Sequence, residues 1–357
     1  MGRACQLTFG RRDNKIGANS MQRFDGRYII ATGHRRAGAQ HVVRLLDYHE
    51  ATLCRRNPMR TGYRPLAKLD FDVPFDTAPE AYLTQWRAAV DHMARHHNDA
   101  DKVAAYPKLY IRKGLRRGLG KGFLRSPLRR RIAGIAYPPF LFPEWRLDPL
   151  YASPESLKEA LPVFRLSDAH AGLASIFDTE SKMSVIHVIR SPQASLYSWW
   201  SRHHIAKNPE GIYDLLKAQF HLLTDEYGLN PDDFATYSLE NLVELELWWW
   251  RYANEIPIRR FSHSSRFMVM PLEAISEDPV AAARIVYRFS ELLLRREQED
   301  GIRADTSHFF VNTPRSGDLP PELVADCLDK VVSDSPLREI YPDGHAPGER
   351  GREGINL

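Results

Sequence analysis

YIIATGHRRAGAQHVVRLL, from Tyr28 to Leu46, joins two sequence patterns at a basic, glycine-containing turn. Its first five residues form an apolar, β-branched run typical of a buried strand, and its last residues carry apolar side chains at helical spacing. The turn between them contains two glycines and two arginines. The stretch predicts a strand, a turn whose N–H groups can bind an anion, and a helix.

A second stretch, VIHVIRSPQASLYSWW from Val185 to Trp200, has the same organisation about 150 residues later. Its apolar run stops at Arg190, and helical periodicity resumes after Pro192. Parallel strands place the turns at their carboxyl ends along one edge of a sheet. Two anion-binding turns on that edge indicate a nucleotide with phosphates at both ends.

Strand and helix patterns alternate through much of the remaining sequence. Strands are predicted at 163–166 and 266–270, and helices at 77–97, 168–177, 195–204, 239–254, 279–294 and 321–332. This alternation predicts an α/β fold with a parallel sheet flanked by helices and a site at the carboxyl ends of its strands. The helix at 239–254 carries three consecutive tryptophans, which point in different directions on a helix, and core packing is the favoured interpretation.

The alternation of strand and helix patterns is interrupted between about residues 60 and 150. This region contains one helical pattern, a basic stretch and the aromatic, proline-rich segment YPPFLFPEW at 137–145. We interpret it as a helical and basic insert or lid within one α/β domain that spans residues 25–342. Residues 1–24 are interpreted as a flexible arm, and the glycine-rich, charged residues 343–357 as a disordered tail.

The composition indicates a cytoplasmic globular protein. Of the 357 residues 43% are hydrophobic, yet no run approaches the roughly 20 apolar residues that span a bilayer. The first 21 residues are polar and basic and lack the apolar core of a signal peptide. Cys5, Cys54 and Cys327 are too few and too far apart to predict a disulfide framework or a cysteine-rich metal site.

Positive charge is concentrated in residues 112–131, where 9 of 20 residues are cationic and none is acidic. The whole chain has a net charge of +4, so the other 337 residues sum to −5. Such a field attracts an anionic glycan or lipid headgroups, which would bring the protein into peripheral contact with a membrane. A solvated basic surface is the alternative. Aromatic residues are sparse in this run, so nucleic acid is not an expected partner.

The first of these two turns, at residues 33–40 and called the first turn below, departs from the phosphate-binding loop of nucleoside triphosphatases. Gly33 and Gly38 have the required spacing, but Ala39 and Gln40 stand where that loop has lysine and a hydroxyl-bearing residue that binds magnesium. The turn therefore retains its N–H groups, with Arg35 and Arg36 as charge partners, and loses the usual magnesium ligand. A sulfuryl group fits this chemistry, because cationic side chains and amides can stabilise its transfer without a metal ion.

These motifs resemble those of the sulfotransferases that use 3′-phosphoadenosine 5′-phosphosulfate (PAPS). The segment Arg35-Arg36-Ala37-Gly38-Ala39-Gln40 is in register with the family's Pro-Arg/Lys-Ser-Gly-Thr-Thr loop, which binds the 5′-phosphosulfate. Arg190, Pro192 and Ser198 match the family's Arg-x-Pro motif and the serine eight residues after the arginine, which bind the 3′-phosphate. Leu45 to Cys54 and FMVMPLEAISEDP at 267–279 also resemble family patterns.

The resemblance implies a P-loop-like sulfotransferase architecture and PAPS as co-substrate. It assigns the 5′-phosphosulfate to Arg36 and the N–H groups from Ala37 to Gln40, and the 3′-phosphate to Arg190 and Ser198. Arg36 would also stabilise the leaving oxygen. The acceptor hydroxyl would belong to a saccharide or glycolipid.

The catalytic base is less clearly marked in the sequence. Some relatives use a glutamate shortly after the position of Cys54, but Arg55, Arg56 and Asn57 occupy that stretch. Others use a histidine about 22 residues before the 3′-phosphate arginine, a count that leads to Asp168, with His170 nearby. Either side chain could accept a hydroxyl proton, although Asp168 is also well placed as a helix N-cap.

Two alternative functions remain from the sequence. A P-loop kinase or nucleoside triphosphatase would share the strand and turn but would need the missing lysine and hydroxyl. A catalytically silent PAPS-binding or nucleotide-binding homologue would account for Ala37, Ala39 and Gln40 in place of hydroxyl-bearing residues. Glu273 is interpreted as ordering a turn.

Overall fold

The computed structural model describes residues 26–55, 80–95, 108, 159–166, 173, 176–202, 205–309 and 319–341. The predicted arm, the predicted tail, the basic run at 112–131 and most of the predicted insert lie outside these residues, as do Asp168 and His170. Both predicted anion-binding turns lie within them.

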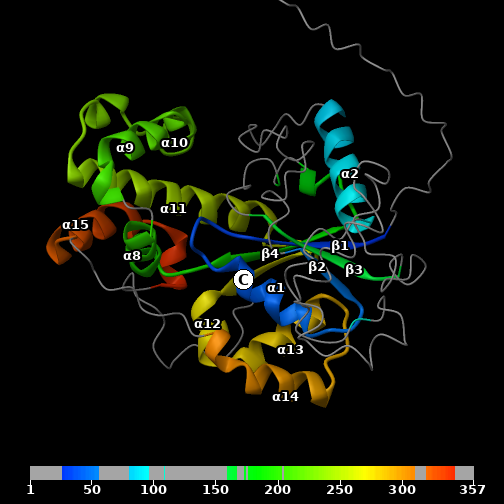
Figure 1. Ribbon diagram of the computed structural model, residues 1–357. Helices are drawn as coiled ribbons and strands as arrows, with labels where there is room; N and C mark the ends of the chain where they lie inside the picture. The colour runs from blue at the N-terminus through cyan, green and yellow to red at the C-terminus, as the bar shows by residue number, and fades with distance from the viewer. Residues whose placement is uncertain are drawn as a thin grey trace, which may run out of the picture.

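A five-stranded parallel sheet forms the centre of the described structure (Figure 1). The strands are β1 (Tyr28–Thr32), β2 (Thr52–Arg55), β3 (Leu161–Arg165), β4 (Met183–Ile189) and β5 (Phe267–Pro271), in the order β2-β3-β1-β4-β5. In the central part, Ile30 of β1 is in register with Phe164 of β3 and Val185 of β4. Every residue of β1 and β4 is buried, which explains why these strands are apolar without alternation. The predicted parallel α/β fold is confirmed.

One face of the sheet is covered by α1 (Ala39–Asp47), α12 (Leu272–Glu277) and α13 (Pro279–Phe289), with α14 (Arg296–Ala304) packed outside α13 (Figure 1). The buried face of α1 includes Val42, Leu45 and Leu46, whose spacing follows the helical period. These side chains pack in one core with Ile29 and Ala31 of β1.

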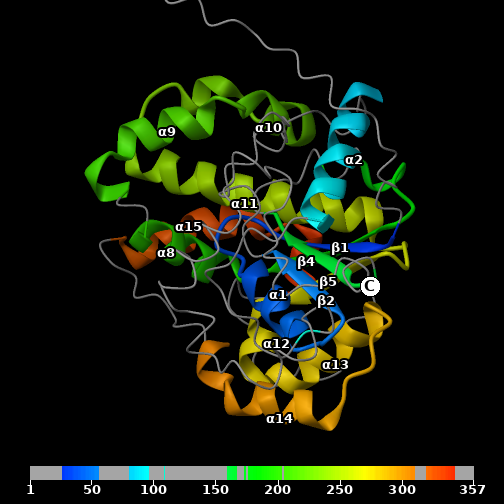
Figure 2. The same cartoon turned by 45° about the vertical axis from the view of Figure 1, so that its right-hand side comes forward.

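The other face is covered by α11 (Leu239–Phe261) and α2 (Glu80–Arg95), which lie on the same side of the sheet in both views (Figure 2). Trp86 of α2 donates a hydrogen bond from Nε1 to the Tyr28 hydroxyl at 2.9 Å. Tyr28 and Trp86 share this core with Phe164 and Phe177. The helix predicted inside the insert region therefore packs directly on the sheet.

A second helical layer extends from α11. It contains α8 (Pro192–Arg202), α9 (Pro209–Lys217), α10 (Phe220–Tyr227), α15 (Pro321–Val332) and short 3-10 turns at Ile205–Lys207, Pro231–Phe234 and Pro336–Glu339. The 3-10 turn at Thr306–His308 follows α14 on the other side of the sheet, where Phe309 packs in the core of α1 and α13. Trp248, Trp249 and Trp250 are all buried, as core packing predicts. Arg251 of α11 joins α15 through a 2.8 Å bond to Val331 O and ion-pairs with Glu255.

Several element boundaries differ from the sequence prediction. α11 continues to Phe261 through Pro257, and both of these side chains are buried. α13 ends at Phe289, earlier than predicted, where Ser290 caps it and Glu291 adopts a φ of 53°. The short edge strand β2 and the helices α9, α10, α12 and α14 were not predicted. Within the described ranges, no helix combines the length and apolar character needed to cross a membrane.

Candidate functional site

The turn after β1 depends on two glycines. A Cβ on Gly33 would lie 2.2 Å from the carbonyl oxygen of Val188, so only glycine lets the turn pass this close to β4. Gly38 has a φ of 90° and precedes the first residue of α1. A Cβ there would also meet Leu272 at 2.6 Å. The two glycines thus bring the turn against β4 and start α1 at Ala39.

Arg36 lies between these glycines in a left-handed conformation with a φ of 69°. A non-glycine residue rarely adopts this conformation, and such residues are concentrated at binding sites. The side chain of Arg36 reaches across to α8, where its Nε donates to the Ser198 hydroxyl at 3.1 Å. Two residues 162 positions apart in sequence therefore meet.

Arg190 directly follows β4, next to the turn after β1, and is only 4% exposed. Its Nη1 donates to the Arg36 carbonyl oxygen at 3.4 Å. Burial lowers the pKa of the Arg190 guanidinium, the nearby Arg36 lowers it further, and Glu273 opposes both effects. Two guanidiniums in a partly desolvated site form a centre that an anion would stabilise.

Ser198 occupies the second turn of α8, because the helix begins at Pro192 instead of the predicted Ser195. Its side chain lies against the turn that follows β1 and is 6% exposed. Ser195, one helical turn earlier, donates from its hydroxyl to the Arg35 carbonyl oxygen at 3.5 Å. α8 thus contacts the first turn through two serines on one face.

Glu273 of α12 stabilises the turn after β4, which carries Arg190 and Ser191. One carboxylate oxygen accepts the Ser191 N–H at 2.9 Å, and the other accepts the Tyr341 hydroxyl at 2.9 Å. Trp250 of α11 donates from Nε1 to the Arg190 carbonyl oxygen at 3.0 Å. Its indole also packs edge-on against Tyr341. The interpretation that Glu273 orders a turn is confirmed, and the turn that it orders is the one that carries Arg190.

The N–H groups of the first turn are not all equivalent. The Ala37 N–H donates to the His34 carbonyl oxygen at 2.9 Å within the turn. Ala39 and Gln40 begin α1, and the first N–H groups of a helix have no partner inside that helix. Binding of an anion by Ala37 would require its bond within the turn to open, whereas Ala39 and Gln40 present helix N-terminal donors without such a change.

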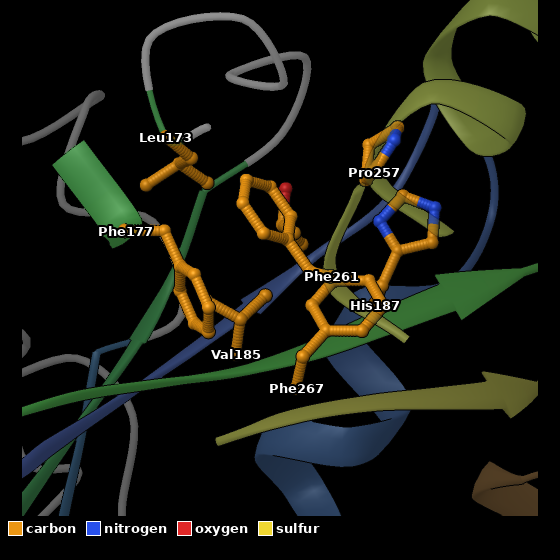
Figure 3. A pocket seen from close by; sticks show the side chains of 8 residues that line it. Leu173, Phe177, Val185, His187, Pro257, Phe261 and Phe267 are labelled. Carbon is orange, nitrogen blue, oxygen red and sulfur yellow. The ribbon is translucent and has the colours of Figure 1, made fainter. Parts of the chain in front are cut away.

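A small cavity lies between the sheet and α11 (Figure 3). Its volume is about 20 Å³, and it is lined by Thr32, Leu173, Phe177, Val185, His187, Pro257, Phe261 and Phe267. His187 pairs through Nε2 with Asn254 Oδ1 at 2.9 Å, and the Thr32 hydroxyl has no hydrogen-bond partner among the described residues. This volume is enough for one water molecule and too small for an acceptor. The cavity therefore belongs to the core.

The family model described as "Sulfotransferase domain" matches residues 128–312, which is just over half of the 357-residue chain. The chain belongs to the sulfotransferase family. The match includes Arg190 and Ser198 of this sulfotransferase and begins after its first turn.

Two solved sulfotransferases are structurally similar to this sulfotransferase at low sequence identity. Sulfotransferase STF9 from Mycobacterium avium is 16% identical over 86% of this chain and 76% of that chain, with a TM-score of 0.39. Sulfotransferase STF1 from Mycobacterium tuberculosis H37Rv is 15% identical over 85% and 77%, with a TM-score of 0.36. No curated protein matches the sequence.

The structure brings together most of the residues that the sequence singles out. Arg35 to Gln40 form the turn after β1 and the first residues of α1, Arg190 lies beside this turn, and Ser198 contacts Arg36. The predicted base candidates Asp168 and His170 lie outside the described residues. Sequence reasoning did not identify the contributions of Trp250 and Tyr341, because nothing in the local pattern distinguishes them from ordinary core aromatics.

Proposed function

We propose that this sulfotransferase moves a sulfuryl group from PAPS to an acceptor hydroxyl of a saccharide or glycolipid without a metal ion. The observation that carries the proposal is the convergence of Arg36, Arg190 and Ser198 from two strand ends and one helix. Two cations and a hydroxyl within one small region match a ligand that carries two separate phosphate groups.

The roles of the residues follow from their positions. Arg190 and Ser198 would hold the 3′-phosphate, and the N-terminal amides of α1 would hold the 5′-phosphosulfate. Arg36 would stabilise negative charge on the bridging oxygen as the bond to sulfur breaks. PAPS supplies an activated sulfuryl group when bound. The site residues orient that group and neutralise the leaving phosphate.

The charge distribution supports an anionic or lipid-linked acceptor. The basic run at 112–131 belongs to the same chain and would attract a sulfated or carboxylated saccharide, or anionic headgroups around a glycolipid. If the acceptor is a glycolipid, the protein would contact the membrane surface peripherally.

Ligand binding separates this proposal from a P-loop kinase. Adenosine 3′,5′-bisphosphate at about 100 times its dissociation constant should stabilise the protein by about 2.7 kcal/mol in a thermal-shift titration. ATP with magnesium at the same concentration should stabilise the protein much less, because ATP lacks the 3′-phosphate that Arg190 and Ser198 would bind. Stronger stabilisation by ATP with magnesium would contradict the proposal.

Transfer of labelled sulfate from PAPS tests the reaction itself. We expect label to appear in one of four acceptor pools, namely acidic glycans, glycolipids, phenols and tyrosine peptides, with the first two favoured. Binding of the bisphosphate without transfer to any pool would instead identify a silent homologue, which the alanines at 37 and 39 and Gln40 would explain.

A further inference from the structure

The peptide group between Arg190 and Ser191 is held by side chains at both of its polar atoms. The Trp250 Nε1 donates to the Arg190 carbonyl oxygen at 3.0 Å, and the Ser191 N–H donates to Glu273 Oε1 at 2.9 Å. A peptide group is planar, so contacts at its carbonyl and at its N–H fix the whole plane. Together with β4 on the other side of Arg190, this plane determines the direction in which the Arg190 side chain leaves the backbone.

The two side chains that hold this peptide group are themselves fixed. Trp250 is 1% exposed and packs edge-on against Tyr341, whose hydroxyl donates to the second carboxylate oxygen of Glu273 at 2.9 Å. Asn254, one helical turn after Trp250, donates to the Trp250 carbonyl oxygen at 2.7 Å and pairs with His187 of β4 at 2.9 Å. A buried network with these contacts is rigid, so it can impose a geometry on the peptide group.

The backbone at the start of α8 leaves the proposed 3′-phosphate mainly to side chains. Glu273 accepts the Ser191 N–H, and Pro192 has no N–H. The Ala194 N–H donates to the Ser191 hydroxyl at 3.3 Å. A helix N-terminus commonly binds anions through such N–H groups, but here a carboxylate and a hydroxyl of the protein already use them. The direction of the Arg190 guanidinium matters all the more for this site.

We propose that Trp250 and Glu273 are positioning residues of the 3′-phosphate site and set the preference for nucleotides that carry a 3′-phosphate. The inference rests on the proposed function, in which Arg190 binds that group. The fixed peptide group holds the Arg190 guanidinium beside the turn after β1, where Nη1 donates to the Arg36 carbonyl oxygen at 3.4 Å. A guanidinium that is held in place before binding loses less side-chain entropy when the phosphate arrives.

Two nucleotides that differ only in the 3′-phosphate separate positioning from general support. Calorimetry gives the dissociation constant of adenosine 3′,5′-bisphosphate, and competition against this ligand gives that of adenosine 5′-monophosphate. The ratio of the second constant to the first measures the contribution of the 3′-phosphate. Trp250→Phe keeps an aromatic ring but removes one hydrogen bond, so the ratio should fall by about 3- to 10-fold. The affinity for the monophosphate should stay nearly unchanged.

The neighbouring tryptophan provides the matched control. Trp249 is also buried, and its Nε1 donates to the Leu216 carbonyl oxygen of α9 at 3.1 Å. Trp249→Phe therefore removes the same kind of hydrogen bond from a helix instead of from a turn of the site. It should lower the melting temperature and leave the ratio of the two dissociation constants unchanged.

Glu273→Gln and Glu273→Ala test the second positioning residue. Both changes remove the charge, but only glutamine keeps an oxygen that can accept the Ser191 N–H. Comparing the two variants therefore isolates the hydrogen bond from the effect of the charge. The ratio should be several-fold higher in Glu273→Gln than in Glu273→Ala.

Equal losses of affinity for both nucleotides in Trp250→Phe would show general structural support and would overturn the inference, as would an unchanged ratio. Should Trp250→Phe fail to fold, the two Glu273 variants decide the question, and equal ratios in them would overturn it. Failure of the proposed function gives a different result. If the unaltered protein binds both nucleotides equally, Arg190 does not bind a 3′-phosphate, and the proposed function and this inference fail together.

Discussion

Arg190 connects the turn after β4 to the turn after β1. It is buried, it donates to the Arg36 backbone, and Glu273 fixes the adjacent Ser191 N–H. Burial and the nearby Arg36 both lower its pKa, so the folded protein keeps this cation at some cost. A bound phosphate would remove part of that cost, which makes the position sensitive to substitution.

Arg190→Ala should weaken binding of adenosine 3′,5′-bisphosphate by about 10- to 100-fold, because one charge-assisted contact contributes about 1.5–3 kcal/mol. Calorimetry measures this directly. Arg284→Ala is the control, since Arg284 is exposed on α13 and pairs with Glu299 far from both turns. Unchanged affinity in Arg190→Ala would remove the 3′-phosphate from this site.

His49 leads to a prediction about pH. Burial lowers the pKa of its imidazole, and the Lys108 ammonium lowers it further. Its Nδ1 also accepts the Ala51 N–H at 3.1 Å, which requires an unprotonated nitrogen. The unfolded chain protonates near pH 6.5, whereas the folded chain does so only at lower pH. Stability should therefore be lost as the pH falls below about 6.5.

His49→Gln should show a shallower fall in melting temperature between about pH 7 and pH 5 than the unaltered protein. Differential scanning fluorimetry across this range is sufficient. His221, exposed on α10, provides the matched variant His221→Gln, whose pH profile should follow that of the unaltered protein. Parallel profiles for all three proteins would show that His49 has no part in the acid sensitivity.

At the scale of elements, α11 acts as the support of the site. One of its faces packs on α15 through Arg251 and Glu244, and another contacts the strand ends through Glu246, Trp250 and Asn254. The segment after α15 completes this support, because Tyr341 closes the contact between α11 and α12. The site is therefore built between elements and is not contained in the two strand and turn motifs alone.

Tyr341→Phe tests the coupling between these elements. The change leaves a partly buried carboxylate oxygen of Glu273 without its 2.9 Å donor, which should cost about 1–3 kcal/mol of unfolding free energy. It should also weaken bisphosphate binding several-fold through the Ser191 turn. Denaturant unfolding and calorimetry measure the two effects.

Tyr213→Phe is the control for this change, because it removes another hydroxyl bond, 2.8 Å to Phe234 O, distant from the turns. It should lower stability with no effect on binding. A Tyr341→Phe protein that loses stability but binds like the unaltered protein would limit Tyr341 to a structural role.

At the scale of the whole molecule, Lys108, which lies between α2 and β3 in the sequence, contacts the C-terminal end of α1. Its side chain is fully buried, and its ammonium contacts the carbonyl oxygens of Asp47 and His49 at 2.6 and 2.8 Å. It also pairs with the Asp47 carboxylate at 3.1 Å. The carbonyls at the C-terminal end of α1 attract a cation, so this lysine caps the helix from a distant part of the chain.

Lys108→Met should lower the unfolding free energy by about 3–5 kcal/mol, because it removes a fully buried ammonium from the Asp47 carboxylate and from two carbonyl oxygens. Urea denaturation measures the loss. Lys217→Met, which removes a solvent-exposed hydrogen bond from the ammonium to the Ala235 carbonyl oxygen, should change stability by less than about 1 kcal/mol. Equal effects in the two variants would show that the buried contacts of Lys108 with the end of α1 do not contribute to stability.

The sequence by itself determined the parallel α/β fold and the residues of the two turns. Buried strands, helical spacing and the glycines of a tight turn are local properties, and the resemblance to short family motifs singled out Arg36, Arg190 and Ser198. The prediction that two distant turns lie side by side also succeeded, because parallel strands bring their carboxyl ends to one edge.

Only the tertiary structure decided which other side chains meet at that edge. Trp250 is 60 residues from Arg190, and Tyr341 is 68 residues from Glu273. The apolar pattern of α11 showed a buried helix but not which of its faces would meet the turns, and Glu244 and Glu246 look alike in sequence. Their different surroundings arise from the rotation of α11 against the sheet and α15, which long-range packing sets and no local pattern records.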